Sequence, residues 1–121
     1  MVFDTIGINK ETFFGQTESI LYQCTIQDEE TDVEIYLTNY RLVYGYDNFI
    51  DCKLLSAISR FGMFYGRNDY EESEDLGSGD FGIYAGDINN YDTFWFTSKK
   101  AWKEFYEELS RAIMDLEASK V

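Results

Sequence analysis

The chain has 121 residues, 45% of them hydrophobic, and its 23 acidic and 10 basic residues give a net charge of −13. This length suits a single domain, residues 1–121, with a core of its own. The acidic excess argues against direct binding to nucleic acid or to anionic membranes, because both need clustered bases to meet phosphate groups. The chain has no histidine, which removes the usual Ser–His–Asp, Cys–His and His–metal arrangements. We therefore expect no catalysis, no metal and no other cofactor.

Two further features concern the compartment. No apolar run approaches the roughly 20 residues that cross a bilayer, and the N-terminus lacks the basic start and apolar core of a signal peptide. We therefore expect a cytoplasmic protein. Cys24 and Cys52 lie on stretches whose alternation groups them with apolar neighbours, which predicts buried, reduced thiols rather than a disulfide.

Period-two alternation predicts the first two strands. Residues 1–15 show little pattern beyond a short helical turn, and we treat them as an N-terminal extension. Alternation then predicts strands over 19–27 and 33–38. The second strand has an apolar and a polar face, which is typical of a half-buried antiparallel strand. The two faces carry Val33, Ile35 and Leu37 on one side, and Glu34, Tyr36 and Thr38 on the other.

The stretch "YLTNYRLVYGY", residues 36–46, places polar residues inside the most apolar part of the chain. Asn39 tolerates the left-handed backbone of a tight turn, and Thr38 can bond its own local backbone, so the Thr-Asn pair predicts a turn between two strands. Arg41 then restarts the chain on the outer face of the third strand. A second turn, "DN" at 47–48, leads into a fourth strand. The apolar face of the third strand carries Leu42, Tyr44 and Tyr46, and that of the fourth carries Ile50, Cys52 and Leu54.

The second half of the chain predicts three more strands. They are "ISRFGMFYG" (58–66), "FGIYA" and "DTFWFT", and the echo between "FGMFYG" and "FGIYAG" indicates paired strands rather than a duplication. Residues 67–80 are acidic, contain Gly and Ser and have little apolar content, which predicts a mobile loop.

The end of the chain predicts one long helix. From Ser98 the hydrophobic period changes to 3.6, which indicates an amphipathic helix over 98–118 with Ser98 as its N-cap. On its polar side, Glu107 and Arg111 are placed to pair at i,i+4. The apolar stripe consists of Ala101, Trp102, Phe105, Tyr106, Leu109, Ala112, Ile113 and Leu116.

Four features, in order along the chain, carry a family resemblance. An acid, Glu18, precedes the apolar pair at 20–21, and the hairpin reads apolar-Thr-Asn-x-Arg-Leu-apolar over 37–43. A Leu-to-Ile step then spans 55–58. The end of the chain reads "FWFTSKKAWKEFYEEL". Over roughly residues 16–113 the chain thereby resembles the bacterial pleckstrin-homology (PH) and GRAM-like families. The resemblance implies a mainly β fold, a PH-like seven-stranded antiparallel barrel or sandwich capped by the C-terminal helix.

The same resemblance implies where a lipid site would lie. In PH domains, phosphoinositides bind at a mouth made by three loops that carry Lys and Arg. The matching loops here read "DEETD", "DN" and "GDINNYD", so we expect the mouth to repel phosphate and the chain not to bind membranes. The acids placed there are Asp28, Glu29, Glu30, Asp32, Asp47, Asp87 and Asp92.

Two stretches, 28–34 and 69–75, each hold five acids in seven residues and no base. Such runs are either solvated loops or surfaces that steer a basic partner. We expect the second stretch to be dispensable for folding, and the PH resemblance implies that the two form separate patches. The candidate partner-binding residues are Asp28, Glu29, Glu30, Asp32, Asp69, Tyr70, Glu71, Glu72, Glu74 and Asp75.

Two hypotheses for function follow. The first is a noncatalytic PH-like module that binds a protein partner, one with a basic surface, or self-associates as a homo-oligomer through an exposed strand edge. The second is an inhibitor of phage or anti-defence type, whose acidic surface imitates nucleic acid and blocks a nucleic-acid-binding protein. Fold alone does not choose between them.

Overall fold

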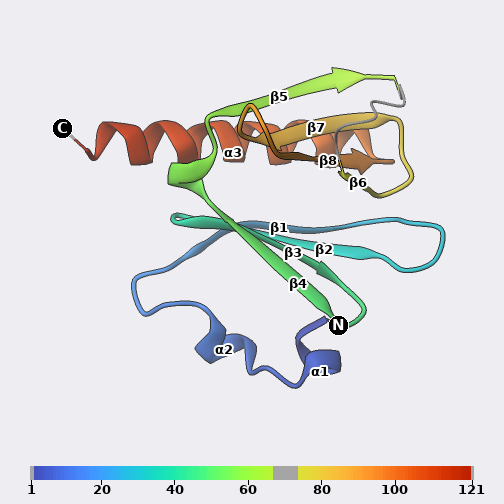
Figure 1. The fold of residues 1–121 in the computed structure, drawn as a ribbon, viewed down its shortest axis with the longest axis horizontal. Coiled ribbons are helices and arrows are strands. Elements are labelled where there is room, and N and C mark those ends of the chain that lie inside the picture. The colour runs from blue at the N-terminus through green and yellow to red at the C-terminus, as the bar shows by residue number, and fades with distance from the viewer. Residues whose placement is uncertain (1, 67–73, 121) are drawn as a thin grey trace.

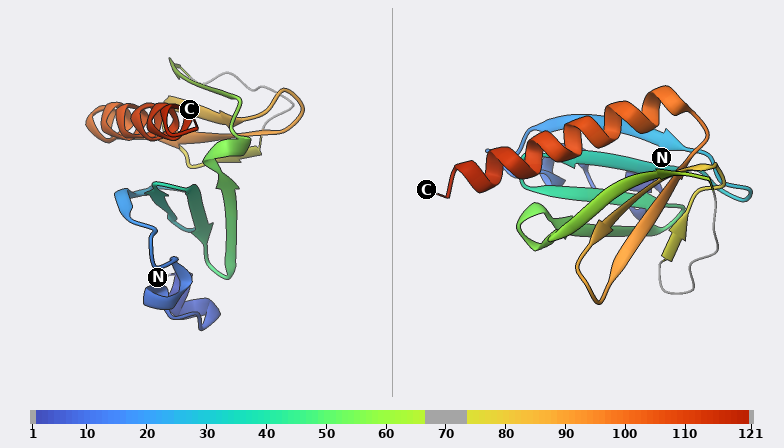
Figure 2. Two further views of the ribbon diagram at one scale, coloured as in Figure 1. Left: turned by 90° about the vertical axis from the view of Figure 1, so that its left-hand side faces the viewer. Right: turned by 90° about the horizontal axis from the view of Figure 1, so that it is seen from above.

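The computed structural model describes residues 2–66 and 74–120. In these ranges, eight strands form two four-stranded sheets that stack on each other, and a long C-terminal helix lies across one opening between them (Figures 1 and 2). None of the helices in these ranges is long and apolar enough to cross a membrane.

The first sheet, in the order β1-β2-β3-β4, consists of β1 (Ile20–Ile26), β2 (Val33–Thr38), β3 (Arg41–Tyr46) and β4 (Phe49–Leu54). The second, in the order β5-β7-β8-β6, consists of β5 (Arg60–Tyr65), β6 (Glu74–Leu76), β7 (Phe81–Gly86) and β8 (Tyr91–Phe96). The helices are α1 (Val2–Ile6), α2 (Lys10–Phe13), the 3-10 turn η1 (Leu55–Ala57) and α3 (Lys99–Ala118).

The mainly β fold with a C-terminal helix is confirmed, but the strand count and the all-antiparallel pairing are wrong. The additional strand β6 lies within the predicted mobile loop and pairs in parallel with β8. Its one apolar residue, Leu76, is buried in the core, and the Asp75 carboxylate accepts a hydrogen bond from Trp95 Nε1 at 3.0 Å. The described end of the predicted loop is therefore ordered, whereas residues 67–73 lie outside the described ranges. The two sheets do not close into a barrel.

The main core lies between the two sheets and under α3. Ile35 and Leu42 of the first sheet meet Ile83 and Phe94 of the second, all of them fully buried. The predicted helix is confirmed, including its cap, because Ser98 Oγ accepts a hydrogen bond from the amide of Ala101. The buried residues of α3 belong to the predicted stripe and are Trp102, Phe105, Leu109, Ala112 and Ile113.

The predicted ion pair on α3 is wrong. Arg111 pairs with Glu108 at i,i+3, with 2.6 Å between nitrogen and oxygen, rather than with Glu107. Both spacings place two side chains on one side of a helix. The sequence alone therefore left the partner of Arg111 open between them.

A second apolar cluster lies on the outer face of the first sheet. Figure 1 shows α1 and α2 beneath this face, away from the second sheet. Phe3 of α1 packs against Tyr36 of β2 with 5.4 Å between ring centroids, and every residue of β2 is buried. The prediction of a half-buried strand is therefore wrong, because residues of the N-terminal extension cover its second face. The cluster consists of Val2, Phe3, Tyr36 and Val43, with Ile6, Phe13, Phe14 and Ile50 packed against it.

This second cluster also explains β4. Cys52 pairs with Val43, so Cys52 and Ile50 point to the side of α1 and α2, while Lys53 faces the second sheet. The apolar side of β4 thus faces away from the main core. Both cysteines are free, as predicted, but only Cys24 is half-buried against that core, where burial raises the pKa of its thiol to about 12; Cys52 is exposed.

The echo between "FGMFYG" and "FGIYAG" is confirmed as a strand pair. β5 and β7 are antiparallel neighbours in which Gly62 faces Tyr84 and Phe64 faces Gly82. A Cβ atom on Gly62 would come within 2.7 Å of the Tyr84 ring, and one on Gly82 within 2.6 Å of the Phe64 ring. Each strand thus supplies the space that the other strand's ring occupies.

Shortening Leu109 tests the packing of α3 on the sheets. Leu109 is fully buried, so Leu109→Ala leaves a cavity and should lower the free energy of unfolding by about 2–5 kcal/mol. Met114 lies on the same helix but is 53% exposed, and Met114→Ala should change this free energy by less than about 0.5 kcal/mol. Urea denaturation measures both values, and equal effects would contradict the packing.

Candidate protein-interaction site

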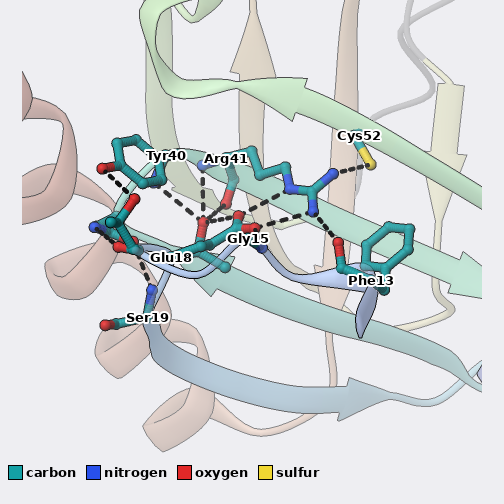
Figure 3. A network of polar contacts seen from close by, with 10 residues as sticks. Phe13, Gly15, Glu18, Ser19, Tyr40, Arg41 and Cys52 are labelled. Atoms are coloured by element: carbon teal, nitrogen blue, oxygen red, sulfur yellow. Dashed lines mark hydrogen bonds and ion pairs between the residues drawn. The ribbon is translucent and has the colours of Figure 1, made fainter. Parts of the chain in front are cut away.

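An ion pair joins the start of β1 to the β2–β3 turn (Figure 3). Arg41 donates two hydrogen bonds to Glu18, from Nε at 2.8 Å and from Nη2 at 3.0 Å, and Nη2 also bonds the carbonyl of Phe13 at 3.0 Å. Thr38 Oγ1 and the amide of Gly15 donate to the same carboxylate. Burial acts to raise the pKa of Glu18, but the hydrogen bonds from Arg41, Thr38 and Gly15 outweigh it and hold that pKa below its ordinary value.

The hairpin turn is built differently from the prediction. Thr38 Oγ1 accepts from the amides of Tyr40 and Arg41, so its bond to the local backbone is confirmed. Asn39 is not left-handed; among the described non-glycine residues only Asp47 has a positive φ, at 52°. The Asn39 amide group instead bonds the chain before β1, accepting from the Ser19 amide at 2.7 Å and donating to the carbonyl of Thr17 at 3.1 Å.

A polar cluster lies between the two sheets. Lys53 of β4 forms an ion pair with Asp92 of β8 at 3.1 Å, and the Tyr44 hydroxyl donates to Asp92 and, at 3.3 Å, to Asp51. Burial, with the nearby carboxylates, raises the pKa of Tyr44. Asp92 was expected among the phosphate-repelling acids of the mouth, but it is 4% exposed and neutralised by Lys53. This cluster therefore ties the sheets together rather than forming a surface.

The acids predicted to bind a partner occupy several environments. Glu29, Glu30 and Asp32 are exposed on the β1–β2 loop, whereas half-buried Asp28 accepts from the amide of Gly77 at 3.1 Å. The first stretch thus contacts the segment that follows the second, while the expectation of separate patches stays a prediction.

The second acidic stretch is only partly described. Glu74 begins β6, and Asp75 accepts a hydrogen bond from Trp95 Nε1; the expectation that this stretch is dispensable for folding stays a prediction. Asp69, Tyr70, Glu71 and Glu72 lie outside the described residues. Within the described ranges, no group of three or more carboxylate or thiol side chains is placed to hold a metal ion.

The sequence predicted an exposed strand edge without naming the strand that forms it. Within the described part of the chain, β5 pairs with β7 alone. The amide of Gly66 donates to the carbonyl of Asp80, in register with the β5–β7 ladder. Because inward and outward backbone groups alternate along an antiparallel edge strand, the amides and carbonyls of Phe61, Met63 and Tyr65 point away from β7.

An apolar strip runs from this edge onto α3. The Phe61 ring lies 6.1 Å from that of Tyr106, and the Tyr65 ring lies 5.3 Å from that of Phe81, which in turn lies 5.2 Å from the ring of Trp102. Tyr65 is 75% exposed. We name this set of side chains the β5–α3 strip; it consists of Phe61, Met63, Tyr65, Phe81 and Tyr106.

No protein-family model, curated protein or solved structure matches the chain. The resemblance to bacterial PH and GRAM-like domains therefore rests on the motif residues, and it stays a prediction. The structure does give two of those residues a role, because Glu18 and Arg41 form the ion pair described above.

Removing the Glu18 charge tests this ion pair. Glu18→Gln leaves the largely buried Arg41 without its anion and should lower the free energy of unfolding at pH 7 by about 1–3 kcal/mol. The matched variant Glu108→Gln breaks an exposed pair with Arg111 and should cost less than about 0.5 kcal/mol.

The pH dependence follows from the lowered pKa of Glu18. The contribution of its charge is complete above the ordinary value of 4.5 and is lost as the pH falls through the lower folded value. The difference between wild type and Glu18→Gln should therefore shrink at acid pH. A difference that stays constant in urea titrations from neutral to acid pH would contradict this assignment.

Proposed function

We propose that the chain is a noncatalytic PH-like protein-interaction module, and that an extended segment of a partner adds to the β5 edge. The observation that carries this proposal is the edge of β5, unpaired within the described ranges, beside a partly buried apolar strip that ends in the exposed Tyr65. In strand addition, main-chain hydrogen bonds provide affinity and alternate side chains provide specificity. The β5 edge and the β5–α3 strip offer both.

The four sheet edges differ in how open they are to another strand. β1 carries a register shift between Ile20 and Tyr22, β4 lies against α1, and β6 has three residues. Bulges, covering elements and short length all protect an edge. β5 has six residues in unbroken register with β7 and, among the residues that the structure describes, none of these protections. It is therefore the edge that best suits a partner strand.

The PH-like part of the proposal is supported by element order and by the motif residues. A four-stranded meander, a second sheet and one long closing helix follow each other along the chain, and the motif residues Thr38 and Arg41 both act in the β2–β3 turn. The parallel strand β6 is an addition to the seven-stranded pattern.

The other hypotheses from the sequence stay predictions. Glu29, Glu30 and Asp32 remain exposed and available to a basic partner. The imitation of nucleic acid has less support, because Asp28 and Asp75 bond groups of this chain. A homo-oligomer remains a specific case of strand addition, in which two copies pair their β5 edges.

Substituting proline for Met63 tests strand addition. The Met63 amide points away from β7, so Met63→Pro removes an outward donor without removing a ladder bond. We expect ten-residue peptides selected by display against the wild type to lose binding to Met63→Pro by at least about tenfold. Met63→Ala, which keeps the amide, should retain most of the binding. Fluorescence anisotropy measures the affinities, and thermal melts check that each variant is folded.

Hydrogen exchange provides a reading that needs no substitution. Peptide binding to the wild type should slow exchange of the outward amides of Phe61, Met63 and Tyr65. Peptides that bind Met63→Pro as tightly as wild type, or that leave these three amides unprotected, would refute the proposal. The failure of any peptide to be enriched would also count against it.

A further inference from the structure

A pocket of about 310 Å³ opens on the outer face of the second sheet. Pockets that take small molecules begin at about this size. Along β5, Arg60 and Phe64 alternate with Phe61 and Met63 of the β5–α3 strip, so pocket and strip lie on opposite faces of the sheet. Among the described residues, the pocket is lined by Arg60, Phe64, Tyr84, Asp87, Tyr91 and Thr93.

The strand register leaves a gap at one end of this face. Gly86 of β7 is the register partner of Arg60 in β5 and of Tyr91 in β8. A glycine is required at this position, because a Cβ atom would collide with the carbonyl oxygen of Asn90. The row from Arg60 to Tyr91 therefore has no side chain at its centre. Tyr84, two residues before Gly86 on the same strand and face, bounds the gap.

Aromatic rings form the apolar wall of the pocket. The Tyr84 ring lies 6.0 Å from the Tyr91 ring and 6.3 Å from the Phe64 ring. All three side chains are partly exposed, and within the described ranges neither tyrosine hydroxyl forms a hydrogen bond. Rings arranged in this way suit a further flat ring, which can stack on one of them or meet it edge-to-face.

Two opposite charges line the same pocket without pairing. Arg60 and Asp87 are both exposed, and neither forms an ion pair within the described part of the chain. The Asp87 Oδ1 atom accepts from the amides of residues 89 and 90, both at 2.8 Å, which holds the pKa of Asp87 below its ordinary value and leaves Oδ2 open. Lys53 also lowers this pKa, but its own ammonium group pairs with Asp92 between the sheets.

The charges restrict which aromatic molecule suits the pocket. Arg60 attracts an aromatic acid, but Asp87 and the net charge of −13 repel it. An aromatic amine is attracted by Asp87 and repelled by Arg60. A molecule that carries both an acidic and a basic group can meet both side chains, and it has no net charge for the rest of the surface to repel.

We propose that this pocket binds a small aromatic zwitterion, of the chemical class of the free aromatic amino acids. Its ring lies against Tyr84 and Tyr91, its carboxylate meets Arg60, and its ammonium group meets Asp87. A guanidinium group suits the carboxylate because it can bind both oxygens at once. This inference goes beyond the proposed function, since the pocket lies on the other face of β5 from the strip.

The experiment is a titration of the wild-type chain with phenylalanine, followed by the amide signals in two-dimensional NMR. Binding should shift the signals of Gly86, Asp87 and Tyr91. Three analogues each lack one feature: phenethylamine lacks the carboxylate, hydrocinnamate lacks the ammonium group, and leucine lacks the ring. Each analogue should bind at least about twofold more weakly than phenylalanine.

Two substitutions then assign the charges. Arg60→Gln should abolish the advantage of phenylalanine over phenethylamine but keep its advantage over hydrocinnamate. Asp87→Asn, whose Oδ1 can still accept from the same amides, should do the reverse. Each should weaken phenylalanine binding about two- to fivefold, and less at high salt. The matched controls are exposed groups away from the pocket, Lys100→Gln on α3 and Asp80→Asn at the other end of β7, which should change the affinity by less than about 1.5-fold.

The analogue series uses only the wild-type chain, so it decides the question even if a variant fails to fold. An analogue that binds as tightly as phenylalanine would overturn the inference. The same holds for shifts confined to the β5–α3 strip, for the absence of any shift at millimolar phenylalanine, and for equal losses from Arg60→Gln and Lys100→Gln. These results leave strand addition untouched, because Met63→Pro tests it separately.

Discussion

One guanidinium group ties the start of β3 to two points in the segment that precedes β1. Arg41 starts β3, binds the carboxylate of Glu18 before β1 and the carbonyl of Phe13 at the end of α2, and lies over the Phe13 ring at 4.5 Å. The outer face of the first sheet is apolar and needs the cover that α1 and α2 provide. Five- and four-residue helices are not stable alone, so the cover depends on this anchor and on its own aromatic contacts. This anchoring role explains why the most apolar stretch of the sequence contains an arginine.

Most of the regular structure could be predicted from the sequence because its period is simple. Two-residue alternation located seven of the eight described strands, and the change to 3.6 at Ser98 located α3. Alternation says which residues share a face, but it does not say what covers that face. Tyr36 and Val43 therefore looked solvent-exposed until Phe3 was seen to pack beside them. β6 has a single buried apolar residue, Leu76, and shows no period at all.

The candidate site was harder to predict for a different reason. The acidic stretches are visible in the composition, so the sequence placed the candidate partner-binding residues there. The β5–α3 strip comes from three elements, with Met63 on β5, Phe81 on β7 and Tyr106 on α3, and no local pattern links these positions.

The crossed pairs of β5 and β7 constrain how this chain can diverge. Gly62 lies under the Tyr84 ring and Gly82 under that of Phe64. An alanine at either glycine would push the opposing ring off the backbone that it shields, and loss of a ring would leave a bare glycine in the strand opposite, which weakens a sheet. The four positions form two coupled pairs. A substitution at one residue of a pair is neutral only when the other residue changes to match it. In descendants of this sequence, glycine and aromatic ring should be inherited and lost together.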